Sequence, residues 1–239
     1  MRAAWVWAMA LVLVGCAPGA ADQGRTLRVG YPAGSVEHYR YHSSVAGTER
    51  TASGGAVAQD RSDVSADAVW RVVSADGRGV LIEQSLANVR PGAASGPMRF
   101  TVAPDGLVVP VAAAGGPALP GSAQFLAILA DRPVRPGDAW TADVRLAGPT
   151  TLRAQSRFER YETWHGRRVA VVSGRSAGPF DLSLRGVRYR GTVDSGSTTW
   201  LDPASGQVVR AENAVTTDFT AGAAAGFSGT YRLELEAAG

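Results

Sequence analysis

The sequence contains no lysine and only one cysteine, Cys16. All 24 basic residues are therefore arginines, and 21 acidic residues reduce the net charge to +3. This near balance gives no electrostatic argument for binding nucleic acid. A single cysteine excludes an internal disulfide framework. The three histidines form no cluster with carboxylates that would close a metal-ligand set, so we expect neither a metal nor a cofactor.

The N-terminus carries an apolar segment of the kind that directs export. After Arg2, an uncharged run extends from Ala3 to Val14 and ends in small residues. Such a run is too short for a stable membrane span and is typical of a secretory signal peptide. We therefore expect residues 1–15 to be a signal peptide.

The end of this segment, Leu13-Val14-Gly15-Cys16, resembles the lipobox of bacterial lipoproteins at all four positions. The resemblance implies cleavage just before Cys16 and a diacylglycerol on its sulfur. Each buried methylene contributes about 0.8 kcal/mol, so such chains would hold the protein on a membrane for a long time. Ala17 follows where an inner-membrane retention signal would have Asp, which favours the outer membrane, facing the periplasm, in a diderm host. The alternative is an ordinary signal peptide with a chance cysteine nearby.

The rest of the chain alternates between apolar and polar residues. Residues 16–26 are expected to form a flexible tether. Near the C-terminus, Tyr231, Leu233 and Leu235 alternate with polar residues, and residues 152–159 and 209–219 repeat the pattern. A period of two predicts antiparallel strands with one solvated face. We expect a mainly β protein with a single domain over residues 27–239, built as an antiparallel curved sheet or half-barrel.

A weak internal repeat suggests two successive β-meanders, one in residues 27–145 and one in residues 146–239. Between them, Ser122–Ala130 is the one segment that predicts a helix, since Ser122 is suited to cap it and Pro133 to end it. Its apolar face, formed by Phe125, Leu126 and Leu129, is expected to pack on the sheet and to contact a ligand. Shared turn chemistry among hairpins is the alternative explanation of the repeat.

The segment after this predicted helix, Pro133-Val-Arg-Pro-Gly-Asp-Ala-Trp140, is the most distinctive turn in the chain. A helix and such a turn between two β-meanders, behind a lipobox, is similar to bacterial envelope proteins of uncharacterised families. In plan it also resembles the half-barrels of lipoprotein carriers such as LolA, LolB and LppX. The resemblance implies a curved sheet that holds an acyl chain.

Residues 193–197, Val-Asp-Ser-Gly-Ser, resemble the active-site loop of aspartic proteases. Those enzymes need two such aspartates that share a proton, and the chain has no second Asp-Ser/Thr-Gly. A homodimer would supply the second copy, but the hydrophobic-hydrophobic-Gly segment that should follow is also missing. We therefore interpret Asp194 as part of a hairpin turn.

Gly174-Arg-Ser176-Ala-Gly178 matches the nucleophile elbow of α/β-hydrolases, but Pro179 follows where a helix should begin and no histidine follows Ser176. His38 and His42 have the spacing of helical metal ligands, yet on a strand this spacing spans about 13 Å, too far for one ion. We therefore expect no catalytic residue and no metal site.

Two further features remain open. Arg185, Arg188 and Arg190 are suited to hold a phosphate or lipid head group, although a solvated strand face is the simpler interpretation. Residues 221–229, which include Phe227, read either as a mobile rim over a cavity or as a slack loop. Phe227 is a further candidate ligand contact.

These observations predict a lipid-anchored, extracytoplasmic protein that is not an enzyme and binds a lipid or another apolar ligand. The alternative is an envelope interaction or assembly protein with a fully packed sheet, whose partner docks at a strand edge. A third hypothesis is a hydrolase that uses Asp194 or Ser176.

Overall fold

The computed structural model describes residues 24–50, 58–92, 96–111, 124–145, 150–184, 187–222 and 225–238. Within these ranges the chain forms eleven β-strands and no helix. The strands are β1 (Val36–Arg50), β2 (Ala58–Asp76), β3 (Gly79–Arg90), β4 (Met98–Val102), β5 (Val108–Val111), β6 (Ala139–Arg145), β7 (Thr151–Trp164), β8 (Arg167–Leu184), β9 (Val187–Leu201), β10 (Val208–Ala221) and β11 (Ala225–Ala237).

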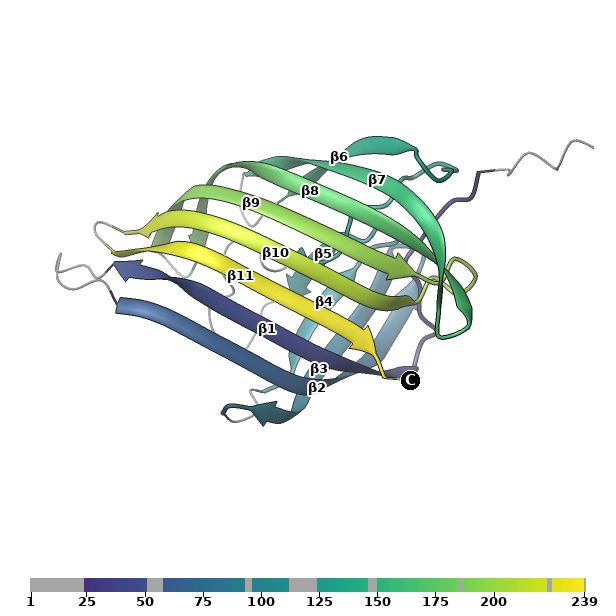
Figure 1. Cartoon of the computed structure of the whole chain (residues 1–239), viewed down its shortest axis with the longest axis horizontal. Coiled ribbons are helices and arrows are strands. Elements are labelled where there is room, and N and C mark those ends of the chain that lie inside the picture. Colours follow the sequence, from purple (N-terminus) through teal and green to yellow (C-terminus); the bar gives the residue numbers. More distant parts are fainter. Residues whose placement is uncertain are drawn as a thin grey trace, which may run out of the picture.

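All eleven strands belong to one antiparallel sheet in the order β5-β4-β3-β2-β1-β11-β10-β9-β8-β7-β6. Strands β1–β5 form one meander and β6–β11 another, and the first and last strands of the chain join them at the centre. The sheet curls into a half-barrel (Figure 1). The prediction of a mainly β, antiparallel half-barrel is therefore confirmed.

Alternation along the strands separates a buried inner face from an exposed outer face. In β7, the inward residues Leu152, Ala154, Ser156 and Phe158 are buried, whereas each of their immediate neighbours from Thr151 to Glu159 is exposed. Strand β10 alternates in a similar way from Ala211 to Thr220, and β11 does so from Arg232 to Leu235, whereas residues 169–172 of β8 are buried on both faces. The period of two in the sequence thus reports which side chains line the half-barrel.

We call the end of the half-barrel that holds the C-terminus the proximal end, and the end where β10 turns into β11 the distal end (Figure 1). The main core fills the proximal part. Trp70 lies at its centre, with its ring centroid 4.6 Å from that of Tyr39 and 5.4 Å from that of Phe100. Its indole N–H donates to Gln84 Oε1 over 2.8 Å, which satisfies the one polar group of the ring.

Two non-sheet segments complete this core from the concave side. Leu27, Val29 and Tyr31 of the N-terminal segment are buried against it. The Tyr31 hydroxyl meets that of Tyr39 over 3.0 Å and accepts from the backbone N–H of Val208 over 3.1 Å. Burial raises the pKa of Tyr31 well above its usual range, so this bridge stays neutral. Two residues before Leu27, Arg25 of the predicted tether forms a β-bridge with Val134.

The second segment is the predicted helix, and that prediction is wrong for the residues described. Residues 124–130 form neither helix nor strand, with a bend at Leu126, and all six from Phe125 to Ala130 are buried. The backbone N–H of Ala127 donates to Thr199 Oγ1 over 2.8 Å, and that of Leu129 donates to the Asp105 carbonyl over 2.6 Å. Neighbouring groups therefore replace the hydrogen bonds of a helix, and a segment enclosed on every side gains nothing from an amphipathic face. Ser122 lies outside the described residues.

Among the described residues, no helix is long and apolar enough to cross a membrane.

The position of Trp70 makes it a sensitive test of this core. We expect Trp70→Ala to lower the free energy of unfolding by about 3–5 kcal/mol, because it leaves a cavity among four aromatic rings. Urea unfolding measures the change. Val73→Ala is the matched control on the same strand, since Val73 is 45% exposed, and it should change stability by less than about 0.5 kcal/mol. Equal effects of the two substitutions would contradict the assigned core.

Candidate functional site

The inner wall of the distal part is formed by three cross-strand rows on β9, β10, β11 and β1. We call these rows the distal wall. Register places the following inward residues side by side: Ser195, Val215, Tyr231 and Val45 in the first row, Val193, Thr217, Gly229 and Gly47 in the second, and Gly191, Phe219, Phe227 and Glu49 in the third. The only charged residue in the three rows is Glu49, which is exposed at the end of the third row.

Aromatic side chains gather at the distal end of this wall. Phe219 lies with its ring centroid 6.2 Å from Phe180, 5.8 Å from Tyr189 and 5.9 Å from Phe227. Together with Leu152, Val193 and Val215, the three phenylalanines form a hydrophobic cluster separate from the main core. The distal end of the half-barrel therefore has an apolar cluster of its own, separate from the main core.

Glycines in the second and third rows make room for these rings. A Cβ atom added to Gly47 would lie 2.5 Å from Phe227 Cζ, and one added to Gly229 would lie 2.7 Å from the same atom. Phe227 therefore lies across two strands in space that only glycine leaves free. Strand β11 begins at Ala225, so the prediction of a loop through residue 229 is wrong.

A polar band crosses the wall between the two apolar regions. The hydroxyls of Tyr41 and Tyr231 point inward and lie 3.5 Å apart, which is longer than the usual O–H···O hydrogen bond of about 2.5–3.0 Å. Burial raises the pKa of Tyr231 well above its usual range. Nearby, Asn213 Nδ2 donates to Ser195 Oγ over 3.1 Å, whereas the buried Oδ1 of Asn213 has no hydrogen-bond partner among the described residues.

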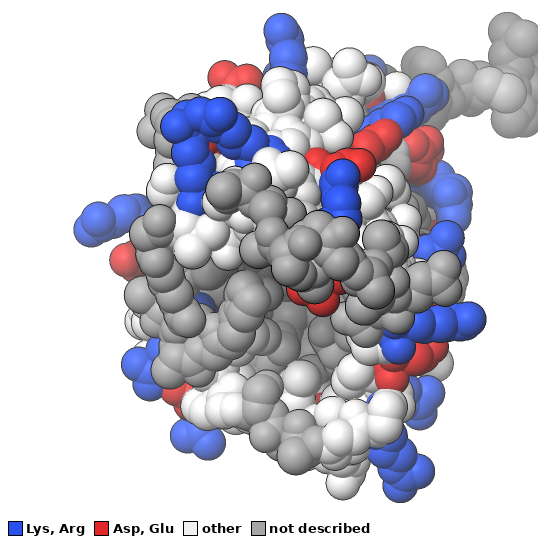
Figure 2. Space-filling view, turned by 90° about the vertical axis from the view of Figure 1, so that its left-hand side faces the viewer, with Lys and Arg blue, Asp and Glu red and all other residues white. Residues whose placement is uncertain are grey.

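A hollow opens at the distal end of the half-barrel. Figure 2 faces this end and shows the recess near the centre of the view, and most of the charged side chains visible there lie toward the outline of the molecule. Several inward residues on β1, β2, β3 and β11 are only half-buried, although they lie on the concave wall: Tyr41, Val45, Val64, Leu86 and Tyr231. Half-burial at inward positions is consistent with a recess along this side of the wall.

The predicted ligand contacts fall into different regions. Phe227 lies on the distal wall. Phe125, Leu126 and Leu129 instead lie in the main core, where the ring centroid of Phe125 is 6.0 Å from those of Trp70 and Phe100. Sequence reasoning missed Tyr41, Tyr231 and Asn213, since only the cross-strand register brings them together. Leu13, Val14, Gly15 and Cys16 lie outside the described residues.

Asp194 lies within strand β9, so the prediction of a hairpin turn at this position is wrong. Its carboxylate accepts two hydrogen bonds from the Arg175 guanidinium of β8, at 3.1 Å from Nε and 2.7 Å from Nη2. This pair lies on the outer face, and the hydrogen bonds from Arg175 hold the pKa of Asp194 below its usual range. A carboxylate kept ionised by an arginine is poorly suited to exchange a proton near neutral pH.

Ser176 lies within the continuous strand β8, opposite Ala154 and Ser195, rather than on a sharp strand-to-helix turn. His38 and His42 lie on the outward side of β1, and His165 lies in the turn between β7 and β8. None of these histidines is placed to activate Ser176. Within the described ranges, no group of three or more His, Cys, Asp or Glu residues has the arrangement of a metal site.

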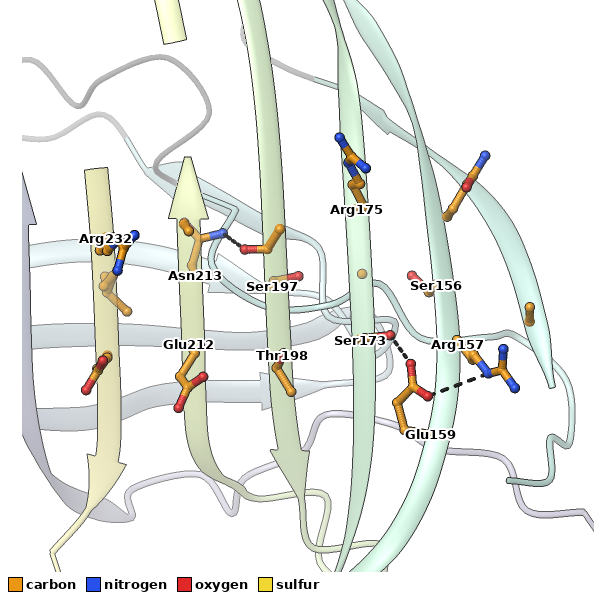
Figure 3. Close-up of a pocket in the computed structure, with 17 residues that line it drawn as sticks. Ser156, Arg157, Glu159, Ser173, Arg175, Ser197, Thr198, Glu212, Asn213 and Arg232 are labelled. Atoms are coloured by element: carbon orange, nitrogen blue, oxygen red, sulfur yellow. Dashed lines mark hydrogen bonds and ion pairs between the residues drawn. The ribbon is translucent and has the colours of Figure 1, made fainter. Parts of the chain in front are cut away.

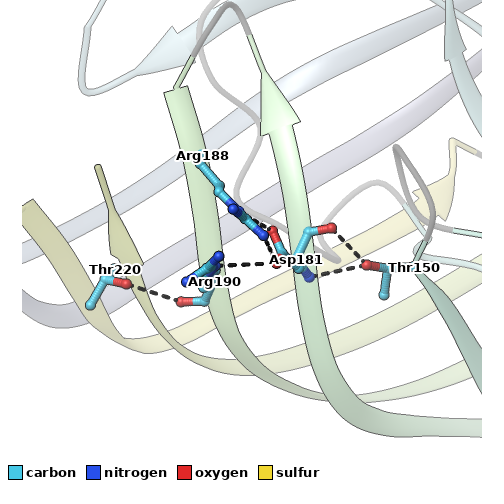
Figure 4. Close-up of polar contacts among 5 residues, drawn as sticks. All are labelled: Thr150, Asp181, Arg188, Arg190 and Thr220. Carbon is cyan, nitrogen blue, oxygen red and sulfur yellow. Dashed lines mark hydrogen bonds and ion pairs between the residues drawn. The ribbon is translucent and has the colours of Figure 1, made fainter. Parts of the chain in front are cut away.

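Arg188 and Arg190 of β9 converge on Asp181 of β8 (Figure 4). Arg188 donates to both Asp181 oxygens, over 2.8 and 2.5 Å, and Arg190 donates to Oδ2 over 3.2 Å. These contacts hold the pKa of Asp181 below its usual range, chiefly through Arg188. Arg185 lies outside the described residues. The two described arginines are engaged with a carboxylate of the same sheet, as expected for a solvated strand face.

The outer face also carries an open groove of about 680 Å³ across β7–β11 (Figure 3). Small residues such as Ser173, Gly196 and Ala214 alternate there with charged ones. Glu159 accepts from the Ser173 hydroxyl over 2.5 Å and pairs with Arg157 over 3.6 Å. Charges of both signs lie side by side in this groove, which leaves no field of one sign to attract a charged ligand.

The close fit of Phe227 over the glycines generates a prediction. We expect Gly47→Ala to destabilise the protein by about 1–3 kcal/mol, because the added Cβ would clash with the Phe227 ring and with the Ser228 carbonyl. Gly196→Ala is the control within β9, where an added Cβ meets nothing within 4 Å; it should leave stability unchanged or raise it by up to about 1 kcal/mol. Urea unfolding compares the two, and equal stabilities would mean that Phe227 does not occupy this position.

Comparison with known proteins adds no relative to this picture: no family model matches the chain, and no curated protein resembles it in sequence.

Proposed function

We propose that this protein is a lipid-anchored, extracytoplasmic binding protein that holds an apolar ligand against the distal wall of its half-barrel. The observation that carries the proposal is the division of the concave face. The proximal part is filled by the chain itself, whereas the distal part has its own apolar cluster and opens into a hollow. Ligand sites are typically concave, mostly apolar and equipped with a few polar groups.

The composition of the distal wall supports this function over a purely structural one. Phe180, Phe219 and Phe227 are buried, at 3%, 7% and 8% exposure, and form an apolar cluster in the wall, and the glycines beside Phe227 leave room for its ring. A few hydroxyl and amide groups interrupt it at the polar band. This arrangement suits an extended hydrocarbon chain, since its affinity grows with each methylene removed from water.

The alternative is an assembly protein that pairs with its partner through an edge of the sheet. Strand β5 is one such edge. Val109 and Val111 of this edge strand are 49% and 41% exposed. Pro110 between them has no N–H, however, and an edge that lacks a donor is a poor template for another strand. The ligand-binding function is therefore the better supported of the two.

Anchoring is the second part of the proposal and depends on Cys16. A lipobox cysteine would carry the acyl chains, and the tether that follows it would connect them to the half-barrel. The half-barrel would then work beside a membrane, where an apolar ligand is available. We propose the outer membrane, facing the periplasm, if the host is diderm.

The binding proposal predicts a bound lipid. When the chain from residue 16, carrying Cys16→Ser and exported behind an unrelated cleavable signal peptide, is purified from its native host without detergent, mass spectrometry of an organic extract should find an apolar molecule near one per protein. Phe219→Arg should abolish the bound ligand, because it places a charge in the apolar wall. Thr216→Arg, on the outer side of the same strand, is the control and should retain the ligand. An empty, folded wild-type protein would favour the assembly function instead.

The anchoring proposal predicts the fate of the full chain in a bacterial host. Wild-type protein should sediment with membranes, and its first tryptic peptide should carry a mass increase that matches acyl chains on Cys16. Cys16→Ser should lose this modification and accumulate as the uncleaved precursor. An unmodified Cys16 in the mature protein, or normal processing of Cys16→Ser, would point to an ordinary signal peptide.

A further inference from the structure

We infer that the distal wall selects an uncharged amphiphile whose polar end donates a hydrogen bond, rather than an anion such as a free fatty acid carboxylate. This inference rests on the proposed binding function and adds the chemical class of the ligand. It comes from the distribution of charge on the two faces of one sheet and from polar atoms that the wall leaves poorly paired.

Charge is the first argument. Apart from exposed Glu49, none of the twelve positions in the three rows of the distal wall carries a charged side chain. Arg50 of β1 and Arg188 and Arg190 of β9 lie on the outer face instead, where they pair with Asp218 and Asp181. An ionised ligand group on the inner wall would therefore lose its hydration without meeting a cation, which strongly disfavours its binding.

Hydrogen-bonding capacity is the second argument. Asn213 is 3% exposed, its Nδ2 is close to three acceptors, and its buried Oδ1 has no partner in the described part of the chain. The Tyr41 and Tyr231 hydroxyls have only their mutual 3.5 Å contact there. Polar atoms in folded proteins are nearly always paired when they are covered, so the half-buried Tyr41 and Tyr231 hydroxyls favour a ligand that pairs with them when it covers the band. Each hydroxyl oxygen can accept a hydrogen bond, which a ligand hydroxyl or amide donates and a carboxylate does not.

Position is the third argument. The polar band lies between the main core and the aromatic cluster: Asn213, Leu233 and Ser43 form the cross-strand row adjacent to that of Tyr231. Tyr231 packs against both hydrophobic clusters. A polar group at the band would therefore place an attached hydrocarbon chain beside the half-buried Val45 and over the buried cluster that contains Phe219 and Phe227, toward the hollow at the distal end (Figure 2).

Three probes with the same hydrocarbon chain test this selectivity: 1-oleoylglycerol, which is neutral and donates hydrogen bonds; methyl oleate, which is neutral without a donor; and oleate, which is an anion at pH 8.5. Each competes for the mature Cys16→Ser protein with N-phenyl-1-naphthylamine, an uncharged fluorescent reporter. We expect 1-oleoylglycerol to bind at least tenfold more tightly than oleate, with methyl oleate between them.

Three variants test whether the polar band causes this selectivity. Tyr231→Phe should weaken 1-oleoylglycerol by about two- to tenfold, as the loss of one hydrogen bond implies, and leave methyl oleate unchanged. Tyr161→Phe makes the same chemical change near the proximal end and should alter neither. Val45→Arg should reverse the preference toward oleate, because it adds a cation to the first row. Circular dichroism confirms that each variant is folded.

The outcomes separate this inference from the function on which it rests. If neither the reporter nor any probe binds the folded protein, the binding function fails. If oleate binds as tightly as 1-oleoylglycerol at pH 8.5, the binding function stands and the selection of neutral ligands is overturned. If Tyr231→Phe weakens all three probes equally, the hydroxyl acts only on the structure of the wall, and the donor requirement is overturned.

Discussion

The pairing of the first strand with the last is the constraint on which the rest of the structure depends. Twelve residue pairs, from Tyr39↔Ala237 to Arg50↔Gly226, join β1 to β11 across nearly the whole chain. Without this seam the two meanders would be separate small sheets, each with one more exposed edge. The seam also fixes the register of the distal wall, since a slip of one residue would turn Tyr41 and Val45 to the outer face. The polar band exists because Tyr41 and Tyr231 meet across this seam.

A second constraint decides which part of the concave face remains for a ligand. A half-barrel has one large apolar face, and leaving all of it exposed would be costly in water. Residues 27–31 and 124–134 bury the proximal part, and they are held by hydrogen bonds to Val208, Thr199 and Asp105. These two segments therefore fill the proximal part of the concave face and leave no room there for a ligand. The distal wall keeps the same curvature but is built from a different set of residues, rich in phenylalanine and glycine.

The sequence allowed the fold class to be predicted because alternation is a local property of each strand. It did not reveal that residues 124–130 are irregular, since Phe125, Leu126 and Leu129 have helical spacing, and the hydrogen-bond partners of this segment lie far away in the chain. Asp194-Ser-Gly was misassigned for a related reason. Asp and Gly favour turns, but here the pairing of β9 with β8 and β10 on both sides outweighs that preference. Of the candidate site only Phe227 was anticipated, because cross-strand neighbours cannot be read from one strand alone.

The two faces of the sheet divide the chemistry of the protein between them. Arginine and carboxylate side chains lie on the outer face of the sheet and pair with each other there, as Arg188 does with Asp181 and Arg210 with Glu212. Exposed pairs of this kind add little stability, but they keep the outer face soluble without leaving a strong field of one sign. On the inner face the same strands present almost no charge. A ligand that reached the distal wall would therefore be recognised by its shape, its apolar surface and the hydrogen bonds of one narrow band, which is the basis for expecting it to be neutral.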